Sequence, residues 1–368
     1  MNYIDFISEF LKRSPFFPKK DRITTGTNGL YGEVETSYRI LSHWSLLIKD
    51  SQIGKDRVVD FIDLFLNEFE NHDLEVGPFK ARDSLTKDTS NGLIGTAWNI
   101  EGIVSVIDLC RMYSLTEYRD SETTLLKMIR DIYSHYNYSQ IDCNWPNVVE
   151  PDGKLLGLDR TFNHQLWFAA SKYQSYKLLA PNESLEDVSH FINNLHVNQK
   201  TNHVGTIYHT LGTYPHYHKT FIKRLISRAY RVEMVQKEYG YHGFNLLAFV
   251  RLYNDGKKEI LGRIVESLKV TKADNFRANQ ENNRYGSSYN PVGLEIAAAI
   301  SYTSFDDPDI LFWINHHFSN HFDETIFQFK NSHDLPTLNA RLYELTYINQ
   351  ETKDILQYDV SENLWSFK

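Results

Sequence analysis

The sequence of 368 residues predicts an all-α protein. Its 18 glycines and 10 prolines make up about 8% of the chain, against roughly 12% in average proteins. That is too few for the many turns of an all-β sandwich or barrel. Wherever a segment is long enough to judge, apolar residues recur with the spacing i, i+3, i+4 and i+7 that is typical of amphipathic helices. Aromatic residues, 14% of the chain, can fill a large core between the helices.

The predicted helices are of two kinds. Six have one apolar stripe and one charged face, as expected of helices that cover a core from outside. These outer helices span residues 3–12, 55–71, 121–136, 184–195, 257–268 and 309–320. Six others are apolar nearly all round, which is typical of buried helices. These inner helices span residues 30–49, 94–113, 161–179, 241–253, 291–302 and 337–348. Their large aromatic residues Trp44, Trp167 and Phe244 are expected in the core.

Inner and outer helices alternate along the chain, and a short repeat supports their pairing. The pattern Asn-Gly-Leu-x-Gly begins at Asn28 and again 63 residues later at Asn91, each time near the start of an inner helix. A recurrence of this length is typical of one helical hairpin per repeat. Six alternating pairs predict an (α/α)6 toroid, with residues 1–368 as a single domain.

An irregular, histidine-rich insertion at about 198–240 interrupts this alternation. It contains a further predicted helix near 219–235 and a weak strand pattern near 204–211. Its histidines lack the i, i+4 pair with a supporting carboxylate that a zinc site needs, so no metal is expected there. They are His203, His209, His216 and His218.

Charge and cysteine content exclude several partners. Lys and Arg number 39 against 47 Asp and Glu, a net charge of −8, so the chain has no global basic field for nucleic acid or an anionic membrane. No run of 18 apolar residues and no secretory signal is present, which predicts a cytoplasmic protein, with a trimmed exported form as the alternative. Cys110 and Cys143 make neither a disulfide framework nor a zinc set, and no cofactor is expected. The oligomeric state stays open.

In a toroid of this kind the inner helices run parallel, which gathers their N-termini at one mouth. Unpaired backbone donors and the helix dipoles favour an anionic ligand there. Aromatic side chains beside carboxylates, amides and guanidinium groups suit sugar rings, which stack through C–H faces and hydrogen-bond at their rims. The candidate substrate-binding residues are Tyr31, Trp98, Asn99, Glu101, Asp159, Arg160, Arg284, Tyr285, Tyr289, Glu295 and Arg341.

Two segments hold the candidate catalytic residues. In residues 159–170, Asn163 and His164 stand at the first turn of an inner helix, before an apolar run that includes a tryptophan. In residues 239–246, Tyr241 and His242 form a Tyr-His pair at the start of the next inner helix.

The two segments resemble the Asn-His and Tyr-His elements of helical-toroid polysaccharide lyases of the alginate-lyase type. The resemblance implies that Asn163 helps to neutralise a uronate carboxylate, that His164 assists proton abstraction, and that Tyr241 acts as general acid or base. Those lyases have an arginine a few residues before the tyrosine, where this chain has Lys237.

The expected function is metal-independent β-elimination on a uronate-containing, acidic poly- or oligosaccharide. Asn163 and an arginine would stabilise the developing negative charge, while Tyr241 or His164 would take the C5 proton and Tyr241 would protonate the leaving oxygen. The substrate is the expected partner.

Three alternatives remain open at this stage. A glycoside hydrolase, distantly similar to the unsaturated-glucuronyl hydrolases, would use two carboxylates among Glu101, Asp159 and Glu295. A sugar 2-epimerase would use His164 and His242 as a facing pair. A non-catalytic toroid would bind glycan without changing it.

Overall fold

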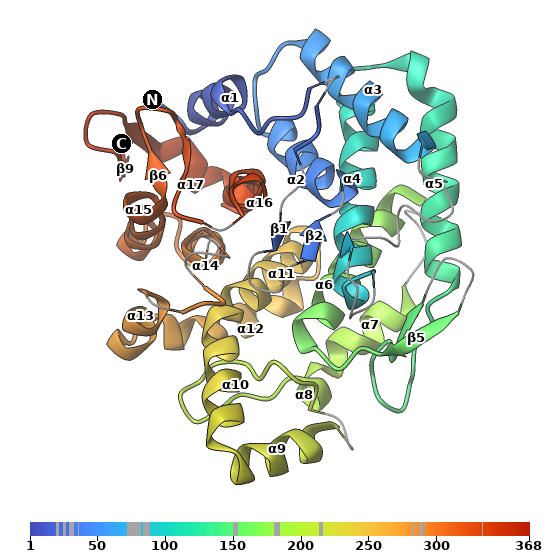
Figure 1. Ribbon diagram of the computed structural model, residues 1–368, viewed down its shortest axis with the longest axis vertical. Coiled ribbons are helices and arrows are strands. Elements are labelled where there is room, and N and C mark those ends of the chain that lie inside the picture. The colour runs from blue at the N-terminus through green and yellow to red at the C-terminus, as the bar shows by residue number, and fades with distance from the viewer. Residues whose placement is uncertain are drawn as a thin grey trace.

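The computed structural model describes residues 1–19, 22–24, 27–28, 33–35, 37–71, 82–83, 89–149, 154–179, 185–212, 216–281, 283–286, 290, 292–332 and 334–368. Helices account for most of these residues, and the strands are short (Figure 1). The all-α class predicted from the sequence is confirmed.

Six inner segments pack against one another in a closed order. Helix α2 contacts α4, α4 contacts α6, α6 contacts α11 and α11 contacts α14. The 3-10 helix η5, which continues α16, contacts both α14 and α2, so the order returns to its start. These segments are α2 (Ser37–Lys49), α4 (Gly92–Met112), α6 (Phe162–Leu179), α11 (His242–Asn254), α14 (Val292–Ser301), α16 (Leu335–Ala340) and η5 (Arg341–Tyr347).

The inner segments run in the same direction, because contacts join equivalent ends. At the C-terminal ends, Lys49 Nζ of α2 lies 2.5 Å from Asp108 Oδ2 of α4, and Asn349, just after η5, donates its N–H to Ser301 Oγ of α14 at 3.0 Å. At the N-terminal ends, Asp159 before α6 accepts the N–H of Leu93 in α4. Parallel helices place the positive ends of their dipoles together.

Outer helices cover the ring and match the predicted outer set within a few residues. Helix α3 packs on α2, α5 on α4 and α6, α7 on α6, α12 on α11 and α14, and α15 on α14. Their bounds are α1 (Tyr3–Arg13), α3 (Lys55–Asn71), α5 (Arg119–Ser134), α7 (Glu186–Asn193), α12 (Leu261–Leu268) with η3 (Lys258–Ile260), and α15 (Pro308–His321). The shorter helices are η2 (Thr116–Tyr118), α8 (Leu195–Asn198), η4 (Lys269–Lys272), α13 (Asp274–Glu281) and α17 (Gln350–Ile355).

The strands form small antiparallel sheets on the periphery, with β1-β2-β3 as a three-stranded sheet and β4-β5, β6-β7 and β8-β9 as hairpins. Their bounds are β1 (Thr27–Asn28), β2 (Glu33–Glu35), β3 (Arg82–Asp83), β4 (Asn147–Val149), β5 (Leu155–Leu158), β6 (Phe322–Asp323), β7 (Gln328–Phe329), β8 (Leu356–Asp359) and β9 (Leu364–Phe367). Pairing of residues 33–35 corrects the predicted start of the first inner helix at residue 30, because β2 uses its backbone in the sheet and α2 begins at Ser37.

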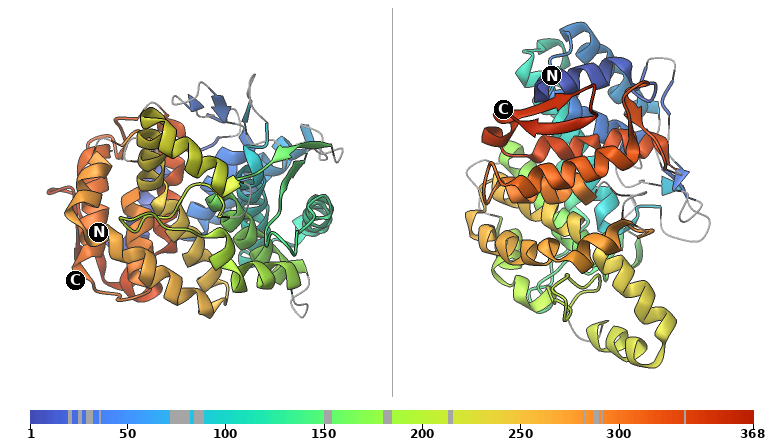
Figure 2. Two further views of the ribbon diagram at one scale, coloured as in Figure 1. Left: turned by 90° about the horizontal axis from the view of Figure 1, so that it is seen from below. Right: turned by 90° about the vertical axis from the view of Figure 1, so that its left-hand side faces the viewer.

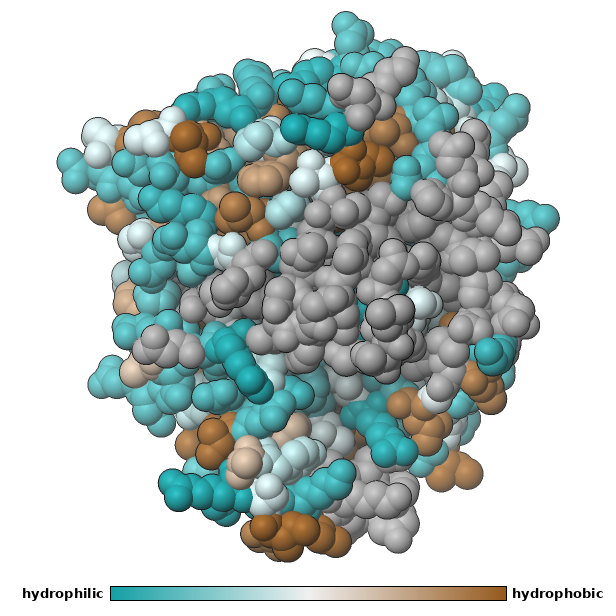
Figure 3. Space-filling view, in the orientation of Figure 1, coloured by the Kyte–Doolittle hydropathy of each residue, from teal (hydrophilic) through white to brown (hydrophobic). Residues whose placement is uncertain are grey.

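The insertion differs from its prediction in two ways. The single helix expected near 219–235 is two helices, α9 (His216–Ile226) and α10 (Arg228–Gly240), because Ser227 is extended and its Oγ accepts the N–H of Tyr230 as an N-cap. Residues 204–211 form isolated bridges and no strand, since backbone bonds tie this segment to residues around Thr161 at the start of α6. The α9–α10 hairpin projects from one end of the molecule (Figure 2). Much of the surface drawn in colour in Figure 3 is hydrophilic.

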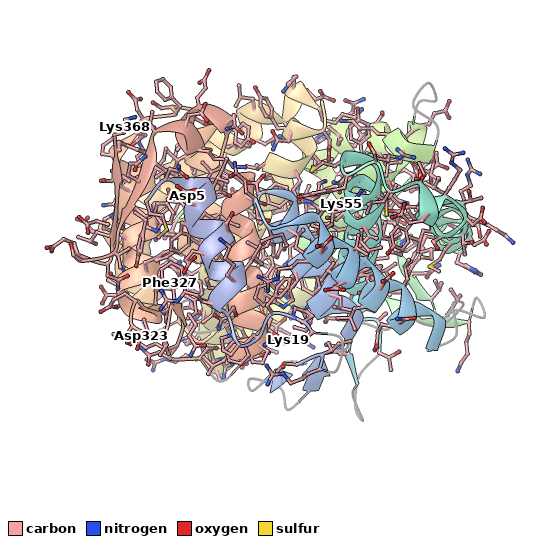
Figure 4. All side chains as sticks on the ribbon, turned by 90° about the horizontal axis from the view of Figure 1, so that it is seen from above. Asp5, Lys19, Lys55, Asp323, Phe327 and Lys368 are labelled. Atoms are coloured by element: carbon pink, nitrogen blue, oxygen red, sulfur yellow. The ribbon has the colours of Figure 1, made fainter. Side chains whose placement is uncertain are left out.

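Helix α1 packs against the C-terminal hairpin, although the two are far apart in the chain. The ring of Phe6 lies 4.7 Å from that of Tyr358 and 4.8 Å from that of Trp365. Figure 4 shows α1, marked by Asp5, beside the turn that holds Phe327. The sequence does not predict the C-terminal hairpin β8–β9, which covers one side of the aromatic core.

The predicted core residues Trp44, Trp167 and Phe244 are buried, which confirms their assignment. Helix α4 is long and apolar enough by composition to cross a membrane, but 94% of its most apolar window is buried inside the protein. Its apolar side chains are part of the core. Cys110 and Cys143 are buried free thiols.

The contact between α2 and α4 depends on Gly102. A Cβ atom at this position would lie 2.0 Å from Ser42 Oγ and 2.6 Å from Ser42 Cα. Because the backbone of α2 would have to move, Gly102→Ala is expected to lower the free energy of unfolding by about 2 kcal/mol and the melting temperature by roughly 2–3 °C. The control is Gly262→Ala in α12, where nothing lies within 4 Å of the added atom. It should leave stability unchanged or raise it by up to about 1 kcal/mol. Equal melting temperatures for the two variants would contradict the close α2–α4 contact.

Candidate active site

The candidate site begins at Asp159, a buried carboxylate between two inner helices. Its Oδ2 accepts the backbone N–H of Leu93 in the first turn of α4 at 2.9 Å, and the same oxygen lies 2.8 Å from Nδ1 of His164 in α6. Its Oδ1 accepts the N–H of Thr161 at 2.9 Å. One carboxylate therefore serves the unpaired donors at the starts of two helices and a histidine side chain at once.

Gly92 makes this close approach feasible. Its φ of +67° lies in the left-handed region, and a Cβ there would lie 2.4 Å from Asp159 Oδ2 and 2.7 Å from His164 Nδ1. Asn91 before it is also left-handed, and its side-chain oxygen accepts from Arg82 Nη1 at 2.8 Å. The second Asn-Gly of the predicted repeat is thus where α4 meets the carboxylate of Asp159. In the first repeat, Gly29 to Gly32 lie outside the described residues.

The charge on Asp159 fixes the tautomer of His164. Burial alone would raise the pKa of Asp159, but the charge and hydrogen bond of His164 and the backbone donors lower it below its ordinary value. An ionised carboxylate only accepts, so Nδ1 of His164 carries the hydrogen and donates it. The other nitrogen, Nε2, faces away from Asp159, and the His164 side chain is 19% exposed.

A stacked aromatic pair lies beside the hydrogen-bonded pair of Asp159 and His164, here called the Asp159–His164 dyad. The ring of Tyr241, at the start of α11, stacks on that of His209 with a centroid distance of 5.3 Å and an angle of 26°. The carbonyl of His209 accepts the N–H of Phe162 in α6, which ties this loop to the helix that holds His164. Burial, with the charges of His164 and Lys237, lowers the pKa of His209 to about 3, so its ring is neutral at pH 7.

Two asparagines add polar groups at the starts of the same helices. Asn163 in α6 and Asn245 in α11 are buried, and the Oδ1 atom of each has no hydrogen-bond donor within the part of the chain that the structure describes. A buried oxygen of this kind needs a donor. Hydroxyl groups of a ligand could supply it.

The centre of the ring is occupied by buried ion pairs. Glu101 Oε1 lies 3.1 Å from Arg251 Nε and accepts from the hydroxyl of Tyr347 at 2.5 Å. Arg341 bonds Glu344 through Nε at 2.8 Å and Glu295 through Nη2 at 3.1 Å.

Burial decides how these carboxyls titrate. It raises the pKa of Glu295 well above its ordinary value and that of Glu344 to about 7, although Arg341 acts in the opposite direction. Burial likewise raises the pKa of Glu101, against the charge of Arg251.

The structure sorts the sequence-predicted residues into separate groups. It brings Asp159, Asn163, His164 and Tyr241 to the starts of α6 and α11. A second group is buried in the interior and consists of Trp98, Asn99, Glu101, Glu295 and Arg341. Arg160 is exposed, and Arg284, which is also exposed, donates to the hydroxyl of the buried Tyr285 at 2.6 Å. Tyr31 and Tyr289 lie outside the described residues.

His242 has contacts of a different kind from those of His164. Its Nε2 donates to the carbonyl of Ser267 at 2.8 Å, and its Nδ1 accepts the N–H of Ile207 at 3.4 Å. Burial lowers its pKa to about 4. Both ring nitrogens are engaged by the protein, so His242 holds α11 against neighbouring segments, and we do not place it in the site.

From the sequence, His209 is only one of four histidines in the insertion, where no metal site is expected. Its partner Tyr241 is distant in sequence, and no spacing rule connects a loop histidine with it. The left-handed conformation at Gly92 can be predicted from the sequence, because an Asn-Gly pair directly before an apolar helix is typical of a left-handed turn. Among the described residues, no three His, Cys, Asp or Glu side chains are grouped to hold a metal ion.

Comparison with known proteins gives one informative similarity. The chain is 28% identical over 357 residues to archaeal glycosylation protein Q of Haloferax volcanii, and the alignment covers 88% of this chain and 91% of that protein. No family model matches the chain, and no solved structure matches it. The resemblance of the two motifs to toroid lyases therefore stays a prediction.

This similarity corrects the expected function. The relative is named for glycosylation and not for the breakdown of polysaccharides, so the β-eliminating lyase expected from the sequence is wrong. The carboxylates considered for a hydrolase also lie in separate pairs, Glu101 with Arg251, Asp159 with His164 and Glu295 with Arg341.

Asp159→Asn tests the joint between the helices. The amide keeps the shape but removes the charge and turns one acceptor into a donor, so we expect the free energy of unfolding at pH 7 to fall by about 1–3 kcal/mol. Folding lowers the pKa of Asp159, so its stabilising contribution is present above the unfolded pKa of about 3.9 and is lost as the pH falls through the folded value. The melting-temperature difference from the wild type should therefore shrink between pH 7 and pH 3. Asp60→Asn, at an exposed position in α3, is the matched control and should show no such trend.

Proposed function

We propose that this chain is a saccharide-modifying enzyme of a glycosylation pathway. The observation that carries the proposal is the Asp159–His164 dyad at the joined starts of α4 and α6, beside the stacked rings of Tyr241 and His209. The similarity to a protein named for glycosylation over most of both chains supports a saccharide as the substrate.

In the proposed chemistry His164 is the group that transfers a proton. An imidazole ring has one nitrogen that donates a proton and one that accepts a proton, so it can act as general acid or base. Asp159 holds the ring through Nδ1 and fixes the tautomer, which leaves Nε2 to exchange a proton with a hydroxyl or a C–H group of the sugar. Asp159 is a positioning residue, because its oxygens are already engaged by the protein.

The remaining residues of the site suit a sugar ring. Tyr241 and His209 present flat faces on which C–H groups can stack, and a neutral His209 adds no charge to that surface. The buried oxygens of Asn163 and Asn245 can accept hydrogen bonds from sugar hydroxyls. Arg160 is exposed one residue after Asp159 and could pair with an anionic group on the substrate.

We also propose that the fold is an (α/α)6 toroid and that the chain forms one such domain. The closed packing order of the six inner segments, their common direction and the outer helices between them support this architecture. The insertion at about 198–240 then supplies both His209 and the α9–α10 hairpin to the domain.

His164→Gln tests the proposed role in catalysis. The probes are free hexoses, hexuronic acids and their nucleoside diphosphate esters, each incubated with the protein in D2O and followed by proton NMR. We expect the wild type to change at least one of them, by a new sugar signal or by exchange of a C–H proton for deuterium. His164→Gln should slow that reaction by at least about 100-fold, the usual contribution of a general acid or base. His196→Gln, at an exposed position in α8, should react like the wild type.

Tyr241→Leu separates binding from chemistry. Losing the aromatic face should raise KM by about tenfold while kcat changes less, because the dyad of Asp159 and His164 is left intact. Two results would contradict the proposed function. One is a sugar that binds, as seen by saturation transfer, but is never changed. The other is a His164→Gln variant that keeps the wild-type rate.

A further inference from the structure

The α9–α10 hairpin exposes a concentrated group of large apolar side chains. Leu225 is 64% exposed and Ile226 is 78% exposed, at the end of α9 where the chain turns into α10. In Figure 3, hydrophobic atoms gather at the lower edge of the molecule, where Figure 1 places α9. Exposed apolar groups of this kind mark a surface that interacts with a protein or a membrane. The exposed apolar residues of the hairpin are Phe221, Ile222, Leu225, Ile226 and Val232.

The same segment is positively charged, whereas the chain as a whole is negatively charged. Residues 216–232 contain five Lys or Arg and no Asp or Glu, whereas the whole chain has a net charge of −8. Arg224 is held inside the protein, where it pairs with Glu238 and lies over the ring of Tyr208. Lys223, Arg228 and Arg231 are exposed around the apolar residues.

The hairpin is fixed to the body of the protein. Ser227 caps α10, and the partly buried Arg224 pairs with the buried Glu238, which joins α9 to the C-terminal part of α10. Glu238 also accepts from Asn202 Nδ2 at 3.1 Å. A projecting tip with a rigid base can enter a surface without unfolding.

We propose that this hairpin binds the surface of an anionic lipid bilayer. Apolar side chains enter the boundary between headgroups and acyl chains, while Lys and Arg beside them attract anionic headgroups. A protein partner would need a groove that fits a convex tip, and nothing here points to one. The charge of the patch favours lipid, since each basic residue near an anionic surface adds to binding. The net charge of −8 for the whole chain predicts no membrane partner. That sum does not show the local positive charge of the hairpin.

Vesicle flotation tests the proposal. The probes are vesicles of phosphatidylcholine alone and of phosphatidylcholine with about 30% phosphatidylglycerol. We expect the full chain to float with the anionic vesicles at low salt and at least tenfold less with the neutral ones. Raising the salt to about 0.5 M should weaken binding, because the Debye length shortens.

Two double variants separate the apolar and the charged contributions. Leu225→Glu with Ile226→Glu removes the apolar tip, and Arg228→Glu with Arg231→Glu reverses the charge. Each should reduce the bound fraction at least tenfold with an unchanged circular dichroism spectrum, since all four side chains are exposed. The matched control is Ile141→Glu, because Ile141 is 92% exposed on a different part of the surface and should not matter.

Three results would overturn the proposal. The first is a chain that does not float with anionic vesicles. The second is equal flotation of the wild type and the Leu225→Glu, Ile226→Glu variant. The third is a dimer, measured by light scattering, that this variant converts to a monomer, which would make a second copy of the chain the partner of the hairpin.

Discussion

The candidate site depends on a single buried carboxylate that two helices share. Asp159 satisfies the first turn of α4 and the start of α6, and it orients His164 with the same oxygen that it offers to α4. A charge in that position would be costly without partners, and the positive ends of parallel helices together with the imidazole supply them. The architecture and the proposed chemistry therefore share one atom, Oδ2 of Asp159. This explains why Gly92, which has no side chain, stands against it.

The interior between the inner segments is organised differently from the candidate site at the starts of α4, α6 and α11. Arg341 and Arg251 each pair with carboxylate groups in full burial, where removing one partner would leave an uncompensated charge. Arg341 connects η5 to α14, and its guanidinium lies 4.4 Å from the centre of the Phe244 ring in α11. These pairs fix the register of three inner segments. They also engage Glu101, Glu295 and Arg341, which the sequence predicts to bind substrate.

The helices can be predicted from the sequence, but not all of the contacts that they make. Apolar periodicity located the outer set and most of the inner set within a few residues, because burial of one face or of all faces leaves a pattern in local sequence. The first inner helix begins seven residues later than predicted, at Ser37. The periodicity did not reveal the break at Ser227 or the hairpin β8–β9, which depend on a cap and on contact with distant Phe6. Within the site, Asn163, His164 and Tyr241 were found from motifs. His209 was not assigned to the site, since only the folded loop brings it to Tyr241.

The packing of α1 on β8–β9 has a consequence for how the chain is made. The ring of Phe6 contacts those of Tyr358 and Trp365, so Phe6 meets these two partners only after some 350 further residues have been made. At about 5–20 residues per second, that wait is on the order of half a minute. During this time Phe6 lacks the rings of Tyr358 and Trp365, whereas Phe10 of the same helix can already pack against Trp44 of α2. Part of the apolar face of α1 is therefore exposed until the C-terminal hairpin has been made, and transiently exposed apolar surface of this kind is prone to wrong association.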